Sequence, residues 1–152
     1  MNVQPEPISP ERFAAYGRVA KPPAGKPLVE GPEFRYWSDA AHYHVEGDTE
    51  VGYCTVYRQP DGMVSWMERH DRTPEILIPV DRPFLLPVMG KDDRVEVFQV
   101  EPGQAAIIGE SVWHSACIPA EGGQATYFVI FRRGTPQEDV TKKDIAPVSI
   151  AA

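Results

Sequence analysis

Four residues with metal-binding or proton-transfer side chains occur at two places in the sequence. Glu68, His70 and Glu75 lie close together in "SWMERHDRTPEILIPV", and His114 follows later in "GESVWHSAC". Imidazole and carboxylate groups held near one another can bind a divalent metal ion or relay a proton. On spacing alone, the first group also fits the polar, solvated edge of a β-hairpin, so both interpretations stay open at this point.

The segment that contains His70 has the pattern of a strand, and this decides which side chains face the same way. Residues two apart share one face of a strand, so Trp66, Glu68 and His70 should point in one direction. Glu75 follows the "DRTP" turn and begins the next predicted strand, where it can close the same site. His114 can complete the site from across a barrel.

The elements that must position these residues are mostly strands. Short apolar or alternating runs, separated by turn signals, occur at 50–58, 63–70, 75–80, 83–89, 94–100, 104–109 and 125–133. Such a series predicts an antiparallel sandwich or barrel and argues against a βαβ fold. Aromatic residues in these runs, among them Tyr53, Tyr57, Phe84, Phe98 and Phe131, are expected to fill the barrel core.

One helix signal precedes the strands, in "ISPERFAAYG". Ser9 can cap a helix, Pro10 suits its first position, and Gly17 can end it. We therefore expect a single domain over residues 1–152, in which 1–49 form an N-terminal helix and a loop arm. Residues 50–134 should form the barrel, and the polar segment 135–152 a C-terminal arm.

Composition limits the possible partners. The formal net charge of -7 and the pI near 5.1 argue against binding to nucleic acid or an anionic membrane. No 18-residue apolar run and no basic start followed by an apolar core are present, so we expect neither a membrane span nor a secretory signal. Cys54 and Cys117 are expected to be reduced thiols in a cytoplasmic protein.

The order of the candidate ligands resembles the cupin superfamily. Its first motif has two histidines separated by one residue and then a glutamate, and here Glu68-x-His70-x4-Glu75 matches it with Glu68 in the place of the first histidine. Its second motif supplies a final histidine after a glycine-containing turn, which matches "IIGESVWH" and His114. The resemblance implies a double-stranded β-helix, that is, a small antiparallel barrel.

Within that superfamily the chain is most similar to the ureidoglycolate lyase family. The likeness covers most of the chain and includes "ISPERFAAYG", "YCTVYRQ", "MERH", "ILIPVDRPFLLPV", "EPGQAAI", "SVWH" and "YFVIFRRG". It implies a homodimeric cytoplasmic enzyme, a carbon–nitrogen lyase that splits (S)-ureidoglycolate into glyoxylate and urea in allantoin and purine breakdown.

The resemblance also implies roles for individual residues. His70, Glu75 and His114 would be catalytic. The same three residues and Glu68 would hold a divalent metal ion of unknown identity. A carboxylate substrate also needs a fixed cation, and Arg58 matches an arginine of the family; Arg58 and Tyr127 are therefore assigned to substrate binding.

Glu75 separates this chain from the family pattern, which usually has glutamine at that position. The departure makes the site more anionic and closer to a metal-binding cupin. Two other functions therefore stay open: a metal-dependent cupin enzyme that acts on another small hydroxy or keto acid, and a non-catalytic cupin that binds a small acid or sugar. A rival cluster, His42, His44 and Glu46 in "HYHVEGD", could form a metal site or only an exposed rim.

Overall fold

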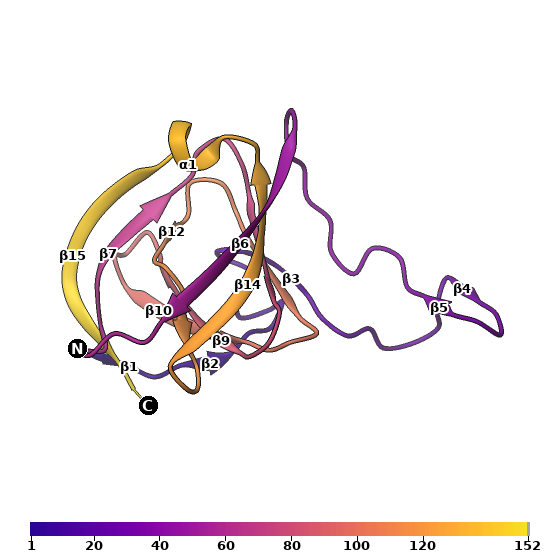
Figure 1. The fold of residues 1–152 in the computed structure, drawn as a ribbon, viewed down its shortest axis with the longest axis horizontal. Coiled ribbons are helices and arrows are strands. Elements are labelled where there is room, and N and C mark those ends of the chain that lie inside the picture. Colours follow the sequence, from indigo (N-terminus) through magenta and orange to yellow (C-terminus); the bar gives the residue numbers. More distant parts are fainter. Residues whose placement is uncertain (152) are drawn as a thin grey trace.

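Two curled sheets make up most of the molecule, and the computed structural model describes residues 1–151 (Figure 1). The first sheet has the order β1 (Asn2–Val3), β15 (Thr141–Ile150), β7 (Met63–Arg69), β12 (Trp113–His114), β9 (Phe84–Met89), β10 (Val95–Val100) and β2 (Glu6–Pro7), and β13 (Ile118–Pro119) also pairs with β9. The second sheet has the order β3 (Gly17–Ala20), β11 (Ala105–Ile108), β8 (Glu75–Pro79), β14 (Gln124–Arg132) and β6 (Thr49–Tyr57). The predicted all-β antiparallel barrel is confirmed.

The barrel forms because the chain passes repeatedly from one sheet to the other. β7 belongs to the first sheet, β8 to the second, and β9 to the first again. Each strand turns one side toward the space between the sheets, where the apolar side chains pack. The core includes the buried residues Val56, Leu77, Phe84, Leu86, Val88, Phe98, Val100, Ala106, Ile108, Ala125, Tyr127, Val129 and Phe131. The expectation of a core position was wrong for Tyr53 and Tyr57, which are 65% and 62% exposed on the outer side of β6.

The predicted N-terminal helix was wrong, although the segment does turn. Phe13 N–H donates to the Ser9 carbonyl and Gly17 N–H to the Phe13 carbonyl, but these helix-type bonds are not consecutive, so the segment forms turns. Its apolar side chains still serve as anchors, because Phe13 and Tyr16 pack on the ring of Phe98. The one helix of the described residues is the single turn α1 (Thr135–Glu138).

The C-terminal segment differs most from expectation. Instead of a separate arm, residues 141–150 form β15, which pairs antiparallel with β7 over most of its length. The register places Lys142 opposite Glu68 and Asp144 opposite Trp66, and a bulge follows Asp144. The barrel therefore extends beyond residues 50–134, and its C-terminal strand lies beside the strand that carries part of the candidate site.

An extended segment between β3 and β6 projects away from the barrel (Figure 1). Its only regular structure is the short hairpin of β4 (Val29–Glu30) and β5 (Arg35–Tyr36). We call residues 21–48 the arm. Among the described residues, no helix has the length and apolar character needed to cross a membrane.

Candidate active site

The structure brings together the four side chains that the two sequence motifs predicted. β7 carries Glu68 and leads directly into His70, β8 begins at Glu75, and β12 ends at His114. His114 is the register partner of Glu68, so the residues from the two motifs lie on neighbouring strands and share a face. Because β8 belongs to the opposite sheet, Glu75 reaches the same place from across the barrel.

Glu75 is the centre of the arrangement. Its Oε2 atom lies 2.9 Å from Nε2 of His114 and 3.1 Å from Nε2 of His70. Glu68 Oε2 lies 3.4 Å from Nε2 of His70. The His70, His114 and Glu75 side chains are 4%, 6% and 12% exposed, whereas that of Glu68 is 22% exposed. The site is thus almost closed, and it is most open toward solvent at Glu68.

Backbone carbonyl groups hold both imidazole rings in place. Nδ1 of His70 lies 2.8 Å from the Asp139 carbonyl oxygen, and Nδ1 of His114 lies 3.0 Å from that of Val112. Since a carbonyl oxygen only accepts hydrogen bonds, Nδ1 of each ring carries a proton and donates it. Nε2 of each ring is therefore the atom available for chemistry at the centre of the site.

Asp139 was not singled out from the sequence, yet it fixes His70. Its carbonyl oxygen accepts the His70 hydrogen bond, and its carboxylate accepts from the backbone N–H groups of Asp71 and Arg72. The segment that follows α1 therefore clamps the β7–β8 turn. These are contacts between residues about 70 positions apart, and no local sequence pattern indicates them.

The close packing shifts the pKa values of all three buried groups. Burial favours the neutral form of each histidine, but contact with the Glu75 carboxylate outweighs it, so the pKa of His70 rises to about 9 and that of His114 also rises. Burial likewise opposes ionisation of Glu75, yet the two imidazoles outweigh it and lower its pKa to about 2. Without a metal ion, these contacts therefore favour the ionised form of Glu75 and the protonated form of both imidazoles.

These shifts predict how the stability of the metal-free protein depends on pH. A histidine whose pKa is raised in the folded protein contributes its full stabilisation below pH 6.5, the pKa in the unfolded chain. For His70 that contribution is lost as the pH rises toward about 9. Glu75, with a lowered pKa, stabilises the fold above 4.5 and loses its contribution as the pH falls toward about 2. We expect the site's contribution to be greatest between about pH 4.5 and 6.5.

Thermal unfolding across this pH range, with chelator present, measures the effect. Glu75→Gln is the matched control, because glutamine keeps the shape of the side chain but cannot form the ion pairs. The difference in Tm between wild type and variant should be largest near pH 5.5 and should shrink on both sides. A difference that does not change with pH would contradict the assignment of these charges.

The donor set fits a divalent metal ion. One donor atom each from Glu68, His70 and His114 lie within 4.8 Å of one another. Nε2 of His70 and Oε2 of Glu75 are buried and have no aligned hydrogen-bond partner in the described structure. Unsatisfied buried polar atoms are uncommon, and here they point toward one another from two sheets. Two neutral imidazoles with one or two carboxylates are ordinary ligands of a divalent transition metal.

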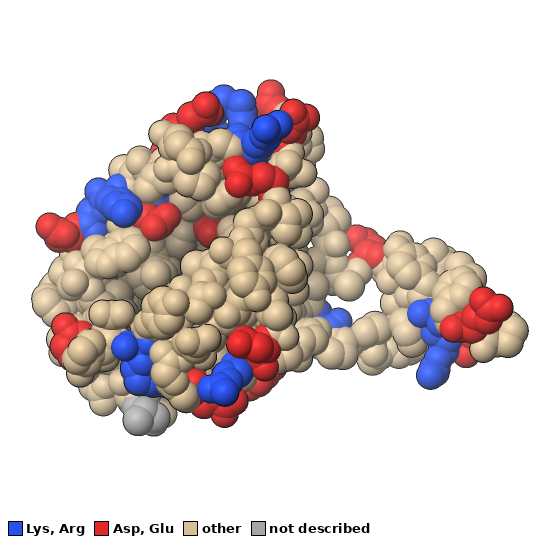
Figure 2. Space-filling model, in the orientation of Figure 1, with Lys and Arg blue, Asp and Glu red and all other residues tan. Residues whose placement is uncertain are grey.

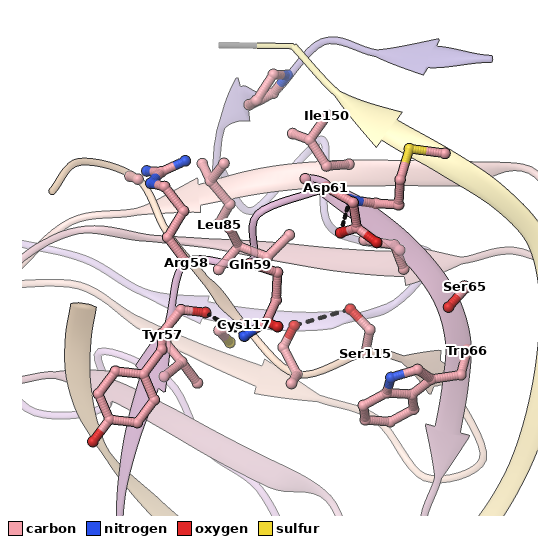
Figure 3. Close-up of a pocket in the computed structure, with 18 of the residues that line it drawn as sticks. Tyr57, Arg58, Gln59, Asp61, Ser65, Trp66, Leu85, Ser115, Cys117 and Ile150 are labelled. Atoms are coloured by element: carbon pink, nitrogen blue, oxygen red, sulfur yellow. Dashed lines mark hydrogen bonds between the residues drawn. The ribbon is translucent and has the colours of Figure 1, made fainter. Parts of the chain in front are cut away.

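A cavity of about 560 Å³ is lined by residues that precede Glu68 on β7 and by residues that follow His114, but by none of the four site residues themselves (Figure 3). Trp66 and Ser115 lie side by side in its wall, and they are close neighbours in sequence of Glu68 and His114. Such a volume accommodates a small organic acid. On the face shown in Figure 2, the surface is hollowed between β6 and the side formed by β7 and β15, and acidic atoms are visible inside the hollow.

Arg58 does not reach the four-residue cluster. It lies across the cavity from Trp66, and its guanidinium donates to the carbonyl oxygens of Pro119 and Gly122 at 2.7 and 2.9 Å (Figure 3). Arg58 and His70 lie near opposite ends of β14. The backbone N–H of Arg58 donates to the carbonyl of Gly123, just before β14 begins, whereas the ring of His70 contacts Phe131, near the end of that strand. The separation is roughly 25 Å along the strand at about 3.3 Å per residue. The structure therefore does not bring Arg58 to the site as a carboxylate clamp.

Tyr127 and the rival histidine cluster also lie apart from the four residues. Tyr127 is buried inside the barrel, where burial and the neighbouring thiols of Cys117 and Cys54 raise its pKa well above the usual value. His42 is on the exposed arm, and its ring lies 3.1 Å from the carboxylate of Asp39. The metal-capable group found within residues 1–151 consists of Glu68, His70 and His114.

A double-sheet antiparallel barrel with a histidine- and glutamate-lined site inside it defines a cupin-type protein. The chain belongs to the ureidoglycolate lyase family, whose model, described as "Ureidoglycolate lyase", matches residues 1–150. The predicted class, a ureidoglycolate lyase-like enzyme, is thereby confirmed.

Two individual proteins illustrate the likeness. The chain is 28% identical over 139 residues to "Ureidoglycolate lyase 2" of Rhizobium meliloti (strain 1021), and the match covers 84% of this chain and 83% of that protein. Among solved structures, it is similar to QdtA, a sugar 3,4-ketoisomerase from Thermoanaerobacterium thermosaccharolyticum, with a TM-score of 0.49 and 15% identity. That match covers 67% of this chain and 69% of the other.

Proposed function

We propose that this protein cleaves (S)-ureidoglycolate into glyoxylate and urea, as a carbon–nitrogen lyase of allantoin breakdown. The observation that carries the proposal is the contact of Glu75 with two buried imidazoles, inside a barrel of the ureidoglycolate lyase family. A cytoplasmic location remains a prediction from the sequence.

The reaction breaks one bond and moves one proton. A base takes the proton of the substrate hydroxyl, the carbon–nitrogen bond breaks as the carbonyl of glyoxylate forms, and the leaving nitrogen of urea accepts a proton. No water is consumed. The site must therefore supply a base, an acid and a positive charge that stabilises the substrate hydroxyl oxygen while it loses its proton and becomes a carbonyl oxygen.

Glu75 and His114 together can supply the base and the acid. Glu75 is ionised at neutral pH and takes the hydroxyl proton, while His114, whose raised pKa favours the form protonated at Nε2, gives its proton to the leaving nitrogen. The 2.9 Å contact between the two then lets the proton on Glu75 pass to His114, which restores the starting state. His70, also cationic, stabilises the developing negative charge on the substrate oxygen.

That is the metal-free scheme, and a metal-bound form of the same site is the second part of the proposal. Glu68, His70, Glu75 and His114 would hold a divalent metal ion, which would supply Lewis-acid polarisation of a substrate oxygen. The geometry that supports this is the group of donor atoms within 4.8 Å of one another, together with the buried Nε2 of His70 and Oε2 of Glu75, which have no aligned hydrogen bond. The same observation favours one alternative function, a metal-dependent cupin enzyme that acts on another small hydroxy or keto acid.

We further propose that the protein is a homodimer. The arm presents Leu28, Phe34 and Tyr36, which are 70%, 58% and 52% exposed, and the outer side of the second sheet presents the exposed Tyr53 and Phe128. In a dimer in which each arm packs on the second sheet of the other subunit, both of these exposed apolar surfaces would be covered. Sedimentation equilibrium tests this assembly, which requires twice the 16.9 kDa mass of the chain.

Product analysis tests the proposed reaction. Purified protein incubated with (S)-ureidoglycolate should form glyoxylate and urea in equal amounts and should release no ammonia, because ammonia would indicate hydrolysis of the ureido group. Turnover of other small hydroxy acids, with none of ureidoglycolate, would favour the alternative function instead.

A further inference from the structure

Two of the four site residues, Glu68 and Glu75, have carboxylate side chains, and the substrate of the proposed reaction is itself a carboxylate. A fixed cation close to the site would help to bind such a substrate.

Lys142 lies where that cation is needed. It is the register partner of Glu68 across the β7–β15 pair, and directly opposed residues of antiparallel strands share a face. Glu68 is also the most exposed of the four site residues, so Lys142 stands on the side from which the site is most accessible. Its neighbours on β15, Thr141 and Lys143, are opposite Arg69 and Met67 and so lie on the other face.

The ammonium group of Lys142 has no acidic partner. Its Nζ lies 5.1 Å from the centroid of the Trp66 ring, and no carboxylate of residues 1–151 comes within 4 Å of it, although Glu68 and Asp144 share its face. Trp66, which precedes Glu68 by two residues on the same face of β7, also lines the cavity. The lysine is thus held against the cavity wall by an aromatic ring with its hydrogen-bond donors free.

Lys143, the next residue, differs from Lys142 in its position and in its contacts. It is adjacent in sequence and has the same side chain, but its Nζ lies 3.9 Å from Asp93 and 4.4 Å from the centroid of the Trp113 ring, on the opposite face of the strand. The two lysines therefore form a matched pair, in which one faces the site and the other does not.

We propose that Lys142 binds the carboxylate group of the substrate at the entrance of the site, the role that the sequence had suggested for Arg58. The inference rests on the proposed function for the identity of the substrate, but it requires only that the ligand be a small carboxylate. Lys142 is a substrate-binding residue in this scheme, and proton transfer remains with Glu75 and His114.

Steady-state kinetics with (S)-ureidoglycolate tests the proposal. Lys142→Ala should raise KM by about tenfold, the usual effect of losing one charge-assisted hydrogen bond, with a much smaller change in kcat. Lys142→Arg should restore most of the loss, and Lys143→Ala should behave as wild type. An active wild type whose KM is unchanged within twofold in Lys142→Ala would overturn the proposal.

Glyoxylate binding separates this inference from the proposed function, because it needs no turnover. Calorimetric titration with glyoxylate should show weaker binding to Lys142→Ala than to wild type or Lys143→Ala, and the difference should shrink at high salt. If wild type binds glyoxylate but does not cleave ureidoglycolate, the proposed function fails while the inference stands. Equal affinity for all three proteins, or no binding by wild type, would overturn the inference.

Discussion

Replacing His114 with alanine should lower the rate of urea release by about 10²- to 10⁴-fold, the usual contribution of a positioned acid or base. His114 is the closest contact of Glu75, at 2.9 Å, and it is also one of the three residues of the metal-capable group. Its loss removes the proton donor in the metal-free scheme and a ligand in the metal-bound one. His70→Ala should have a comparable effect, because His70 takes part in both schemes.

His44→Ala is the control for this experiment, since it removes a histidine of the rival cluster on the arm. The variant should keep full activity. Circular dichroism should show that all three variants keep the β-sheet spectrum of the wild type. Full activity of both His70→Ala and His114→Ala would contradict the assignment of the site.

Glu75→Gln should have the second large effect, because Glu75 is the residue on which both histidines depend. Without its charge, burial favours the neutral form of both imidazoles, and their pKa values fall. The proposed base is lost and the site has one anionic ligand fewer. Family members usually have glutamine at this position, so the expected loss is specific to the carboxylate base proposed for this chain. We expect urea release to fall at least about 100-fold and the affinity for a divalent metal to fall by about tenfold or more.

Metal titration of the purified variant, together with the turnover assay, measures both changes. Glu30→Gln is a suitable control, because Glu30 is an exposed residue of β4 on the arm and is not part of the four-residue site. A Glu75→Gln variant with wild-type turnover and wild-type metal affinity would show that Glu75 is neither base nor ligand. Loss of metal affinity with unchanged turnover would remove the metal from the reaction.

The part of the site that could be predicted from sequence is the part governed by strand alternation. Glu68 and His70 share a face because they are two residues apart, and Glu75 follows one turn later. The place of His114 in the site could not be predicted from strand alternation, because its pairing with Glu68 is a contact between residues 46 positions apart. Only the order of the two motifs in a known family indicated that His114 belongs to the site.

The position of Arg58, apart from the four-residue cluster, shows the limit of this reasoning. Arg58 follows a well-predicted strand, but the sequence does not show at which end of the barrel that strand finishes. The nine-residue pairing of β6 with β14 carries Arg58 away from Phe131 and the histidines. Strand registers of this kind depend on long-range packing, which local periodicity does not contain.

Lys142 was missed for a related reason. The C-terminal segment is polar and contains Pro147, and a proline inside an apolar run argues against a central strand. In the structure, Pro147 lies in the bulge of β15, between Asp144 and Val148, where the ladder is interrupted. Only the register of β15 against β7 shows that Lys142 and Glu68 are neighbours.

The rate of urea release from (S)-ureidoglycolate, with chelator-treated protein before and after addition of divalent metal ions, tests the central claim most directly. The account predicts that the protein releases urea and glyoxylate together, and that a divalent ion raises the rate. Absence of urea release both without metal and with each divalent ion tried would contradict it.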